Sequence, residues 1–342
     1  MDKMAVTAIV VNYNSGPDLA CCITQLLKDT DHLHRLVVCD NASADDSWQA
    51  AAQSDDPRVE LIRSDLNLGL AAAVNVVLPE IATPYIAILN PDVVVGDTWL
   101  EPLVVKLQDD PAAAVACPLV MLAGSGRINS AGQHLHLTGL GFNRCQDETV
   151  EQVTQVLQQN HPVGLHGAAF LIRRESLISI GGWNETGFLY QEDVALSWDI
   201  LLLGMNIELV PDSVVVHDYF LTMYPEKLFL LERNRWALVL SHLQFRWILL
   251  ISPLLLVTEL MTWGLAVLRG PSYMLAKWRG YLWVWKNRDA VISWKQAVFA
   301  RPVYDLPNLR RSLGWSYPLK QIIGLGSERG VSKRIPPGGL RN

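Results

Sequence analysis

Two acidic motifs and one histidine carry residue types suited to catalysis by a metal ion and a general base. The first motif, Asn90-Pro91-Asp92, interrupts the apolar run IAILNPDVVV at the point where a strand would end. A carboxylate at a strand end can bind Mg²⁺ or Mn²⁺, whose ligand shells are often completed by substrate phosphates. The alternative is that Asp92 only caps the following turn, because Asn-Pro and Pro-Asp are ordinary turn sequences.

The second motif, Glu192-Asp193, opens the helix-like stretch QEDVALSWDILLLG. A helix N-terminus stabilises carboxylates in its first turn, so an acid there could take a proton from a hydroxyl as a general base. Plain helix N-terminal charge is the alternative. His217 follows the apolar run VVV. Neutral imidazole binds transition metals, Mn²⁺ included, although a hydrogen-bonded structural histidine is an equally good interpretation.

An alternation of strand and helix patterns would position these residues. Polar side chains follow three predicted strands, as Asn12-Tyr13-Asn14, Asp40-Asn41 and the Asn90 motif. Ligands of parallel α/β sheets bind at these carboxyl ends, and the β-α-β order predicts a doubly wound, mostly parallel sheet. Strands are predicted at 7–12, 35–40, 59–64 and 85–90, and helices at 17–29, 45–53 (capped by Ser43), 69–81 and 191–204.

The usual glycine-rich phosphate loops are missing from the sequence. After the first strand the chain reads NYNSGPD rather than G-x-G-x-x-G, and no G-x-x-x-x-G-K-[ST] occurs. This disfavours a nicotinamide or ATP site built on a glycine turn, so side chains would have to hold a nucleotide. The five cysteines show no C-x-x-C spacing, which favours a reduced environment over disulfides or a zinc site.

Charge divides the chain into an acidic front and a basic back. Residues 1–224 hold 10 Lys and Arg against 28 Asp and Glu, whereas residues 225–342 hold 18 against 6. Eight of the 12 tryptophans follow residue 235. This pattern predicts a soluble head and a membrane-seeking tail. It also disfavours nucleic-acid binding, because the acidic head would repel phosphates.

The tail contains one apolar stretch long enough to cross a bilayer. Residues 247–268 contain only the charge of Glu259 and the helix breaker Pro253, and about 20 residues suffice for a span. Basic residues lie on both sides of the stretch, so an in-plane or re-entrant segment kinked at Pro253 fits the positive-inside tendency better than one span. An amphipathic helix is predicted at 227–240, and an interfacial helix with Lys277 and other basic residues at 271–288.

Taken in chain order, the motifs VVNYNS, VVCDNASADDS, NLGLAAAVN, ILNPDVVV, GGWNETGFLYQED and VPDSVVVHDY resemble family 2 glycosyltransferases of the GT-A fold. Within that family they are most similar to a rhamnosyltransferase-like branch that builds bacterial cell-surface glycans. The resemblance covers about residues 5–220. Together with the hydropathy and charge of the tail, it predicts a catalytic domain at 1–225, amphipathic and apolar membrane-associated helices at 226–300 and a basic tail at 301–342. It also implies an inverting, metal-dependent enzyme at the cytoplasmic face of the cell membrane.

The resemblance assigns a role to each motif residue. The implied donor is a dTDP- or UDP-linked sugar, with L-rhamnose one candidate, and the implied acceptor is a glycan or a polyprenyl-diphosphate lipid. Mg²⁺ or Mn²⁺ would be the cofactor. The roles are nucleotide-sugar binding by Val11, Tyr13, Asp40, Asn67, Gly69, Asn75 and Asn90, metal binding by Asp92 and His217, catalysis by Asp193 and Glu192, and shaping of the acceptor side by Gly167 and Trp183.

The catalytic helix departs from the pattern of the family. Ala195 stands where relatives have a second acid, and Asp199-Ile200 where an arginine is usual. Arg233 is a candidate to contact the diphosphate in place of that arginine. These departures keep open a non-catalytic scaffold with the same fold in a membrane glycan-assembly complex. A nucleotidyltransferase is disfavoured, because NYNSGPD lacks the Gly-rich basic loop that such enzymes need.

Overall fold

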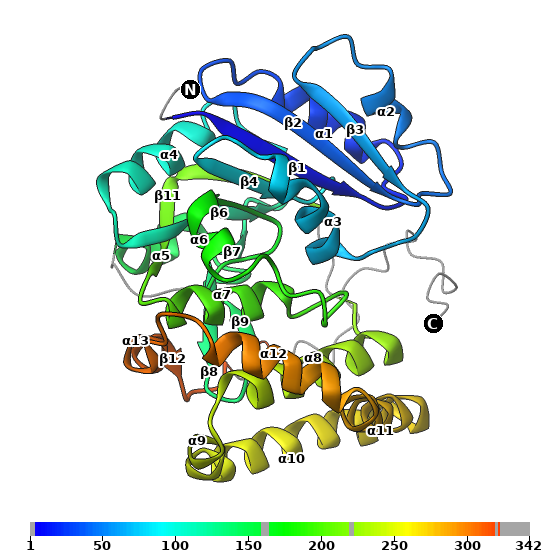
Figure 1. Cartoon of the computed structure of the whole chain (residues 1–342), viewed down its shortest axis with the longest axis vertical. Coiled ribbons are helices and arrows are strands. Elements are labelled where there is room, and N and C mark those ends of the chain that lie inside the picture. Colours follow the sequence, from blue (N-terminus) through cyan, green and yellow to red (C-terminus); the bar gives the residue numbers. More distant parts are fainter. Residues whose placement is uncertain (1–3, 159–163, 219–221, 319–320, 322–342) are drawn as a thin grey trace.

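One mixed sheet forms the centre of the protein, with strand order β3-β2-β1-β4-β10-β6-β11-β5 and β7 paired to β6. The computed structural model describes residues 4–158, 164–218, 222–318 and 321 (Figure 1). The first four strands are parallel, as predicted, because helices return the chain to the same edge each time. They are β1 (Val6–Asn12), β2 (Leu33–Asn41), β3 (Val59–Ser64) and β4 (Tyr85–Leu89), connected through α1 (Asp18–Leu26), α2 (Gln49–Ala52), α3 (Leu70–Val77) and the short η1 (Leu78–Glu80).

Beyond β4 the sheet becomes mixed. Strand β10 pairs antiparallel with both β4 and β6, and β11 pairs parallel with β6. The mixed, mostly parallel α/β class is confirmed. The elements of this half are β5 (Val93–Val95), α4 (Leu100–Asp109), β6 (Ala113–Leu122), β7 (Ile128–Ser130), α5 (Val150–Gln158), β10 (Ala169–Arg173), α6 (Arg174–Ser179), α7 (Glu192–Leu202) and β11 (Asn206–His217).

Alternating side chains give the sheet two buried faces. In β1, Ile9 belongs to a core cluster with α3 and α7, whereas Ala8 and Val10 belong to a second cluster with α1 and α4. This follows from the two-residue period of a strand. The register places Asn12 opposite Asp40 at the carboxyl edge of the sheet, so the polar strand ends gather at one edge as predicted.

A helical layer follows the sheet. Helices α11 and α12 contact α8, α10 contacts α11 (Figure 1), and α13 returns to α7 while β12 pairs with β8. The proposed boundaries at residues 225 and 300 stay predictions. The elements are β8 (Gln133–His136), β9 (Gly141–Asn143), α8 (Pro225–His242), α9 (Phe245–Leu250), α10 (Ser252–Arg269), α11 (Pro271–Lys286), α12 (Arg288–Phe299), α13 (Leu306–Ser312) and β12 (Leu313–Gly314).

Two local predictions were wrong for an identifiable reason. The helix predicted at 45–53 begins only at Gln49, because preceding side chains bind the backbone of the loop: Ser43 accepts from the amide of Asn14, and Asp45 from that of Gly16. The helix at 227–240 is not amphipathic but buried on most sides. Helices α11 and α12 cover it, and Lys277 of α11, which was expected at an interface, is buried between Glu232 of α8 and Glu259 of α10.

Candidate active site

The Asn90-Pro91-Asp92 turn follows β4, where the sheet carries its polar edge. The amide of Asn90 donates to the carbonyl of Ala168 at 2.9 Å, and the amide of Val93 closes the turn onto the Asn90 carbonyl at 3.3 Å. The carbonyl of Asp92 accepts from the amide of Asp218 at 3.3 Å. The backbone is therefore held between β10 and the end of β11, and the Asp92 side chain, 34% exposed, is left available.

Asp92 and His217 form the part of the site that can hold a cation. Nε2 of His217 lies 3.3 Å from Oδ1 of Asp92, and that buried Oδ1 accepts no hydrogen bond from the described residues. Nδ1 of His217 lies 3.1 Å from the amide oxygen of Asn129. Because the amide oxygen of Asn129 can only accept, the proton between these two atoms belongs to Nδ1, and Nε2 is the ring nitrogen that faces Asp92.

Two acceptor atoms at this separation fit a shared cation. Neighbouring ligands on Mg²⁺ or Mn²⁺, each about 2.1 Å from the ion, are about 3 Å apart. The described residues contain no group of three or more His, Cys, Asp or Glu that could hold a metal. A cation here would therefore take its remaining ligands from water and from substrate oxygens, as such hard ions commonly do.

His166 supports the same corner of the site. Its ring lies edge-on to that of His217, with centroids 6.0 Å apart. Burial, together with the nearby His217, lowers the pKa of His166 to about 3. His166 is therefore neutral at physiological pH and adds no positive charge that would repel a cation.

Asp193 is held by three hydrogen-bond donors at the start of α7. Its Oδ2 accepts from Nε2 of Gln133 at 2.7 Å and from the amide of Gly167 at 3.3 Å, and its Oδ1 accepts from the amide of Val194 at 2.8 Å. Burial raises the pKa of Asp193, whereas these donors favour the ionised form and limit that rise. The result is a fixed carboxylate whose proton affinity is higher than that of a solvated aspartate.

Glu192 has a different environment. Burial and the adjacent Asp193 raise the pKa of Glu192 well above its usual range, and the nearby Lys227 opposes the rise. Its Oε2 accepts no hydrogen bond from the described residues, while its backbone carbonyl accepts from the indole of Trp183 at 3.0 Å. Both acids have a raised pKa, and Asp193 is the one whose carboxylate is held by three hydrogen-bond donors.

The segment His166–Ala168 connects the two acidic motifs. Ala168 binds the Asn90 turn, Gly167 binds Asp193, and His166 contacts the ring of His217. A side chain at position 167 would lie 3.5 Å from the Asp193 carboxylate, so glycine leaves that approach open. The structure thus brings Asp92, His217, Gly167 and Asp193 to one short stretch of backbone, although their catalytic roles stay predictions.

Three residues predicted to bind the nucleotide sugar, Val11, Tyr13 and Asp40, lie at the ends of β1 and β2. Asp40 is buried, and its carboxylate accepts from Nδ2 of Asn12 at 2.8 Å, the amide of Ser43 at 3.3 Å and Nε of Arg63 at 3.2 Å. Tyr13 is 41% exposed, and Val11 is partly buried against the core. Asp40 therefore organises the strand ends, and Tyr13 presents the exposed aromatic ring.

Asn67, Gly69 and Asn75 meet the loop that precedes α7. Asn67 accepts from the amide of Gly69, whose φ is +81° and where any Cβ atom would collide with the carbonyl of Phe188. The Asn75 side chain accepts from the amide of Trp183 at 2.8 Å and donates to its carbonyl at 2.7 Å. These residues hold the loop beside α3, and their contacts with a sugar stay predictions.

Trp183 and Arg233 have their polar groups engaged by protein. Trp183 is 2% exposed and packs edge-on against Phe170, so any effect on an acceptor would pass through Glu192. Nη2 of Arg233 donates to the carbonyl of Gly187 at 2.9 Å, and its guanidinium lies over the ring of Trp283. The proposed diphosphate contact of Arg233 stays a prediction.

Three amide side chains of the site were missed in the sequence. Gln133 binds Asp193, Asn129 binds His217, and Nδ2 of Asn234 lies within 2.7–2.9 Å of three carbonyls in the loop 187–190. A lone Asn or Gln has no recognisable pattern, because its partners lie far away in the chain. The only available signal was position, since Asn234 adjoins the candidate Arg233.

Comparison with protein families assigns a family to the chain, and the polar edge of the sheet and the two acidic motifs are consistent with that family. The family model described as glycosyl transferase family 2 matches residues 7–181, about half of the chain, and the chain belongs to this family. It is 28% identical over 229 residues to N-acetylglucosaminyl-diphospho-decaprenol L-rhamnosyltransferase of Mycobacterium tuberculosis, covering 61% of this chain and 74% of that protein. It is also 27% identical over 220 residues to the pre-mycofactocin glycosyltransferase of the same organism, covering 63% of this chain and 43% of that protein.

Solved structures agree with the fold. The chain superposes on GalNAc-T7, crystallised with UDP, GalNAc and Mn²⁺, with a TM-score of 0.59 and 16% identity, covering 87% of this chain and 58% of that chain. It superposes on the mannosyltransferase PcManGT of Pyrobaculum calidifontis, in complex with GDP-Man and Mn²⁺, with a TM-score of 0.50 and 17% identity, covering 87% of both chains. At these identities the likeness supports the GT-A fold alone, and that predicted fold is confirmed.

Proposed function

We propose that the protein is an inverting glycosyltransferase that moves a sugar from a nucleotide diphosphate to a hydroxyl of a glycan or polyprenyl-diphosphate acceptor. Family membership supports glycosyl transfer from a nucleotide sugar. L-Rhamnose and a lipid-linked acceptor are suggested by the name of the mycobacterial relative, and dTDP as the carrier of that sugar is part of our proposal. The observation that carries the proposal is that both acidic motifs adjoin the segment His166–Ala168, Asp193 through Gly167 and the Asn90-Pro91-Asp92 turn through Ala168.

Asp92 and His217 would hold Mg²⁺ or Mn²⁺, and the Mn²⁺ in the two structural neighbours supports a divalent cation. A bound cation would neutralise charge on the departing diphosphate. Asn129 keeps the His217 ring turned toward Asp92. On the nucleotide side, Val11, Tyr13 and the loop around Gly69 would position the donor, which lowers the entropic part of the barrier.

Asp193 would act as the general base. As the acceptor oxygen bonds to the anomeric carbon, the bond from that carbon to the diphosphate oxygen breaks with its electron pair, and the hydroxyl proton passes to the Asp193 carboxylate. Attack from the face opposite the leaving group inverts the anomeric centre. Gln133 and Gly167 fix the carboxylate for this transfer. The three donors to Asp193 favour its ionised form, whereas burial and the adjacent Asp193 raise the pKa of Glu192.

The departures at Ala195 and Asp199 have a structural explanation. Asp199 is buried and accepts from Nη1 of Arg301 at 2.6 Å and from Nε2 of His242 at 2.9 Å. Ala195 lies in the main core cluster. Asp199 therefore joins α7 to α8 and to the turn after α12, and its presence does not argue against an active enzyme.

The test is a panel of UDP-, dTDP- and GDP-linked sugars, assayed by thermal shift with and without Mn²⁺. One nucleotide should stabilise the protein, since a ligand that binds only the folded state raises its melting temperature. That donor is then assayed for hydrolysis and transfer with wild type, Asp92→Asn and Asp193→Asn. Loss of turnover in Asp193→Asn with donor binding retained would support the proposal. Donor binding without turnover by wild type would instead favour a scaffold.

The proposed location is the cytoplasmic face of the cell membrane. A polyprenyl-linked acceptor stays at the bilayer, so an enzyme acting on it benefits from remaining there. One helix among the described residues, Ser252–Arg269, is long and apolar enough to cross a membrane.

A further inference from the structure

Helix α10 carries its polar residues inside and its apolar residues outside. Thr258 is buried and Glu259 largely so, whereas Leu256, Leu260 and Leu268 are 60%, 66% and 88% exposed. A helix on the surface of a water-soluble protein shows the opposite pattern. Only 17% of the 18 residues of α10 are buried. The inversion is favourable if the outer side meets hydrocarbon rather than water.

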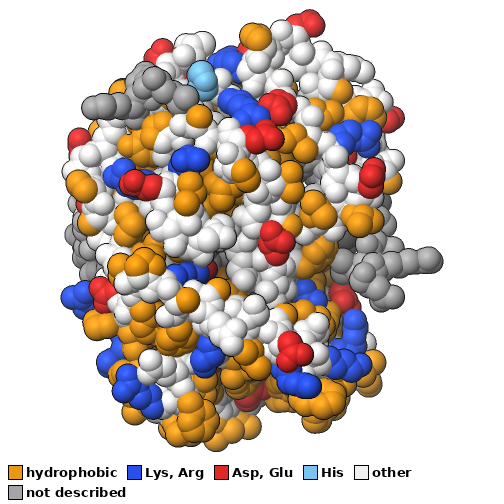
Figure 2. All heavy atoms as spheres, viewed as in Figure 1, with side chains coloured by type: hydrophobic (Ala, Val, Ile, Leu, Met, Phe, Trp, Pro, Cys, Tyr) orange, Lys and Arg blue, Asp and Glu red, His pale blue; other side chains and the backbone are white. Residues whose placement is uncertain are grey.

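Helix α11 has the same inversion. Lys277 is fully buried, whereas Leu275 and Trp278 are 62% and 56% exposed. Figure 2 shows apolar side chains gathered at the lower end of the molecule, where Figure 1 places α9 to α11. We call this region the apolar face and define it by its most exposed members, Leu249, Leu256, Leu260, Leu268, Leu275 and Trp278.

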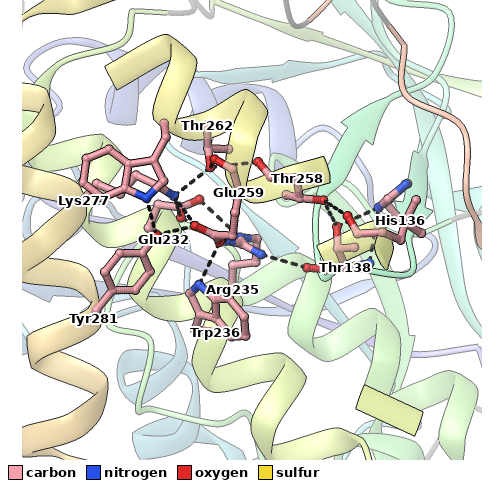
Figure 3. A network of polar contacts seen from close by, with 12 residues as sticks. His136, Thr138, Glu232, Arg235, Trp236, Thr258, Glu259, Thr262, Lys277 and Tyr281 are labelled. Carbon is pink, nitrogen blue, oxygen red and sulfur yellow. Dashed lines mark hydrogen bonds and ion pairs between the residues drawn. The ribbon is translucent and has the colours of Figure 1, made fainter. Parts of the chain in front are cut away.

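A buried ion network fixes the inner side of both helices (Figure 3). The Glu259 carboxylate contacts the guanidinium of Arg235 and the hydroxyl of Tyr281, and lies 3.0 Å from Nζ of Lys277. Glu232 binds the same two cations from α8. Moving α10 away from α8 would take Glu259 from its partners and leave two buried cations facing the single carboxylate of Glu232, at a cost of several kcal/mol. The network therefore ties α10 to the side of the catalytic domain.

This attachment does not fit a single transmembrane span. Helix α8 continues into the core cluster through Ala237, Leu238 and Val239, so α10 cannot enter a bilayer alone. A spanning α10 would carry Glu259 and its partners toward the hydrocarbon centre, where charged side chains are costly. With α10 lying in the plane of the interface, only the apolar face enters the lipid, and the ion network stays within protein.

The charges around the apolar face are basic. Glu259 is the only acid in residues 245–286, and it points inward. The exposed Arg246 and Lys286 border the same helices, and at the start of α12 the exposed Arg288 lies 3.9 Å from the exposed Asp289. Basic residues beside an apolar face with tryptophans complement anionic headgroups, each worth about 1 kcal/mol near such a surface. A second protein copy with the same basic border would instead be repelled.

We propose that α9, α10 and α11 form an in-plane docking surface for an anionic lipid bilayer, held in shape by the Glu232–Arg235–Glu259–Lys277 network. This inference rests on the proposed function in one respect only: a lipid-linked acceptor would explain why docking on a membrane is useful. Lipid binding itself needs no sugar transfer, so the two can fail separately.

The test is flotation of the full chain with vesicles of phosphatidylcholine, alone or mixed with phosphatidylglycerol. Wild type should float with the anionic vesicles, bind less at high salt and be released by alkaline carbonate, which does not extract spanning proteins. Leu256→Gln/Leu260→Gln/Leu268→Gln should lower the partition coefficient at least about tenfold, because it removes apolar contact without changing charge. The matched control, Val105→Gln/Val150→Gln/Ile178→Gln, alters exposed apolar residues of α4, α5 and α6 and should float like wild type.

A second measurement does not depend on the leucine variants folding. Brominated lipid in the same vesicles should quench the tryptophan fluorescence of wild type, and quenching should fall in Trp278→Phe/Trp285→Phe. Four results would overturn the proposal: wild type that stays unbound, equal loss of flotation in the control, retention after carbonate, or self-association in place of vesicle binding. None of these readouts requires enzymatic turnover.

Discussion

Gln133, at the first position of β8, donates its side-chain N–H to the carboxylate of Asp193, at the start of α7, across 2.7 Å. Sixty residues separate the two in the chain. The amide of Gly167 donates to the same oxygen. An amide side chain has no charge of its own, so Gln133 can orient the carboxylate and stabilise its ionised form without neutralising it.

Replacement of Gln133 should therefore change the pH profile of transfer. In Gln133→Ala the carboxylate loses a donor that favours its charged form, so the pKa of Asp193 rises and the acidic limb of the kcat profile moves to higher pH. Gln133→Glu should move the limb further, because it adds a like charge. We expect kcat to fall about 10- to 100-fold with KM for the donor unchanged. An acidic limb that stays in place in both variants would show that Gln133 is only structural.

Asn129 should control metal affinity through His217. Its amide oxygen lies 3.1 Å from Nδ1 of His217, and partners of this kind typically contribute about 10- to 100-fold to metal affinity. Asn129→Ala should weaken Mn²⁺ binding, measured by the electron paramagnetic resonance signal of free Mn²⁺, by about tenfold. Asn129→Asp keeps an acceptor for Nδ1–H and should restore most of the affinity. Equal losses in both variants would contradict this role.

Asn234 should stabilise the loop that precedes α7. Its amide contacts the carbonyls of Gly187, Leu189 and Tyr190, while Phe188, Tyr190 and Gln191 adopt φ of 57°, 65° and 67°. Residues other than glycine rarely adopt these values, so the loop needs external support. Asn234→Ala should lower the free energy of unfolding by about 1–3 kcal/mol in urea titrations.

A matched pair of variants tests that interpretation. Asn234→Asp keeps the acceptor for Nε of Arg233, 3.0 Å away, but it cannot donate and sets a carboxylate oxygen against three carbonyls, so it should be no more stable than Asn234→Ala. Gln155→Ala, at an exposed position of α5, should leave stability within about 0.5 kcal/mol of wild type. If Asn234→Ala matched Gln155→Ala, the three carbonyl contacts would carry no net stabilisation.

Local patterns predicted the sheet, whereas long-range contacts were beyond them. The β-branched runs that form β1 to β4 and the acids after β4 and before α7 were visible because their signal lies within a few residues. Gln133, Asn129 and Asn234 act on partners at least 44 residues away, and a single amide carries no periodic signal. Lys277 was misplaced for the same reason: only the fold shows that Glu232 and Glu259 compensate its charge.

His136 should make stability depend on pH. Burial lowers the pKa of His136 to about 4, from an unfolded value of 6.5. Below pH 6.5 the unfolded chain therefore binds a proton that the folded chain binds only near pH 4. The contribution of His136 to stability is fully present above pH 6.5 and is lost as the pH falls. Between about pH 7.5 and 5 the loss should be about 2 kcal/mol. The measurement is urea unfolding of wild type and of His136→Asn across this pH range. The amide oxygen of the new Asn can replace Nδ1 as the partner of Thr138, and the pH-dependent loss of stability due to His136 should be absent in the variant.

Glu259 should be far more important for stability than its position in an apolar helix suggests. It neutralises Arg235 and Lys277, both fully buried, and among the described residues Glu232 is the only other acid that forms ion pairs with these two cations. Glu259→Gln leaves two buried cations facing one carboxylate, so the free energy of unfolding should fall by about 3–5 kcal/mol. The surface pair Arg279–Glu226 provides the control. The Arg279 side chain is 47% exposed, so Glu226→Gln should cost less than about 1 kcal/mol. Arg235→Met combined with Glu259→Gln should recover part of the loss, since the double variant restores charge balance between Glu232 and Lys277. If the double variant instead lost as much stability as Arg235→Met and Glu259→Gln lose separately, added together, the two residues would not interact.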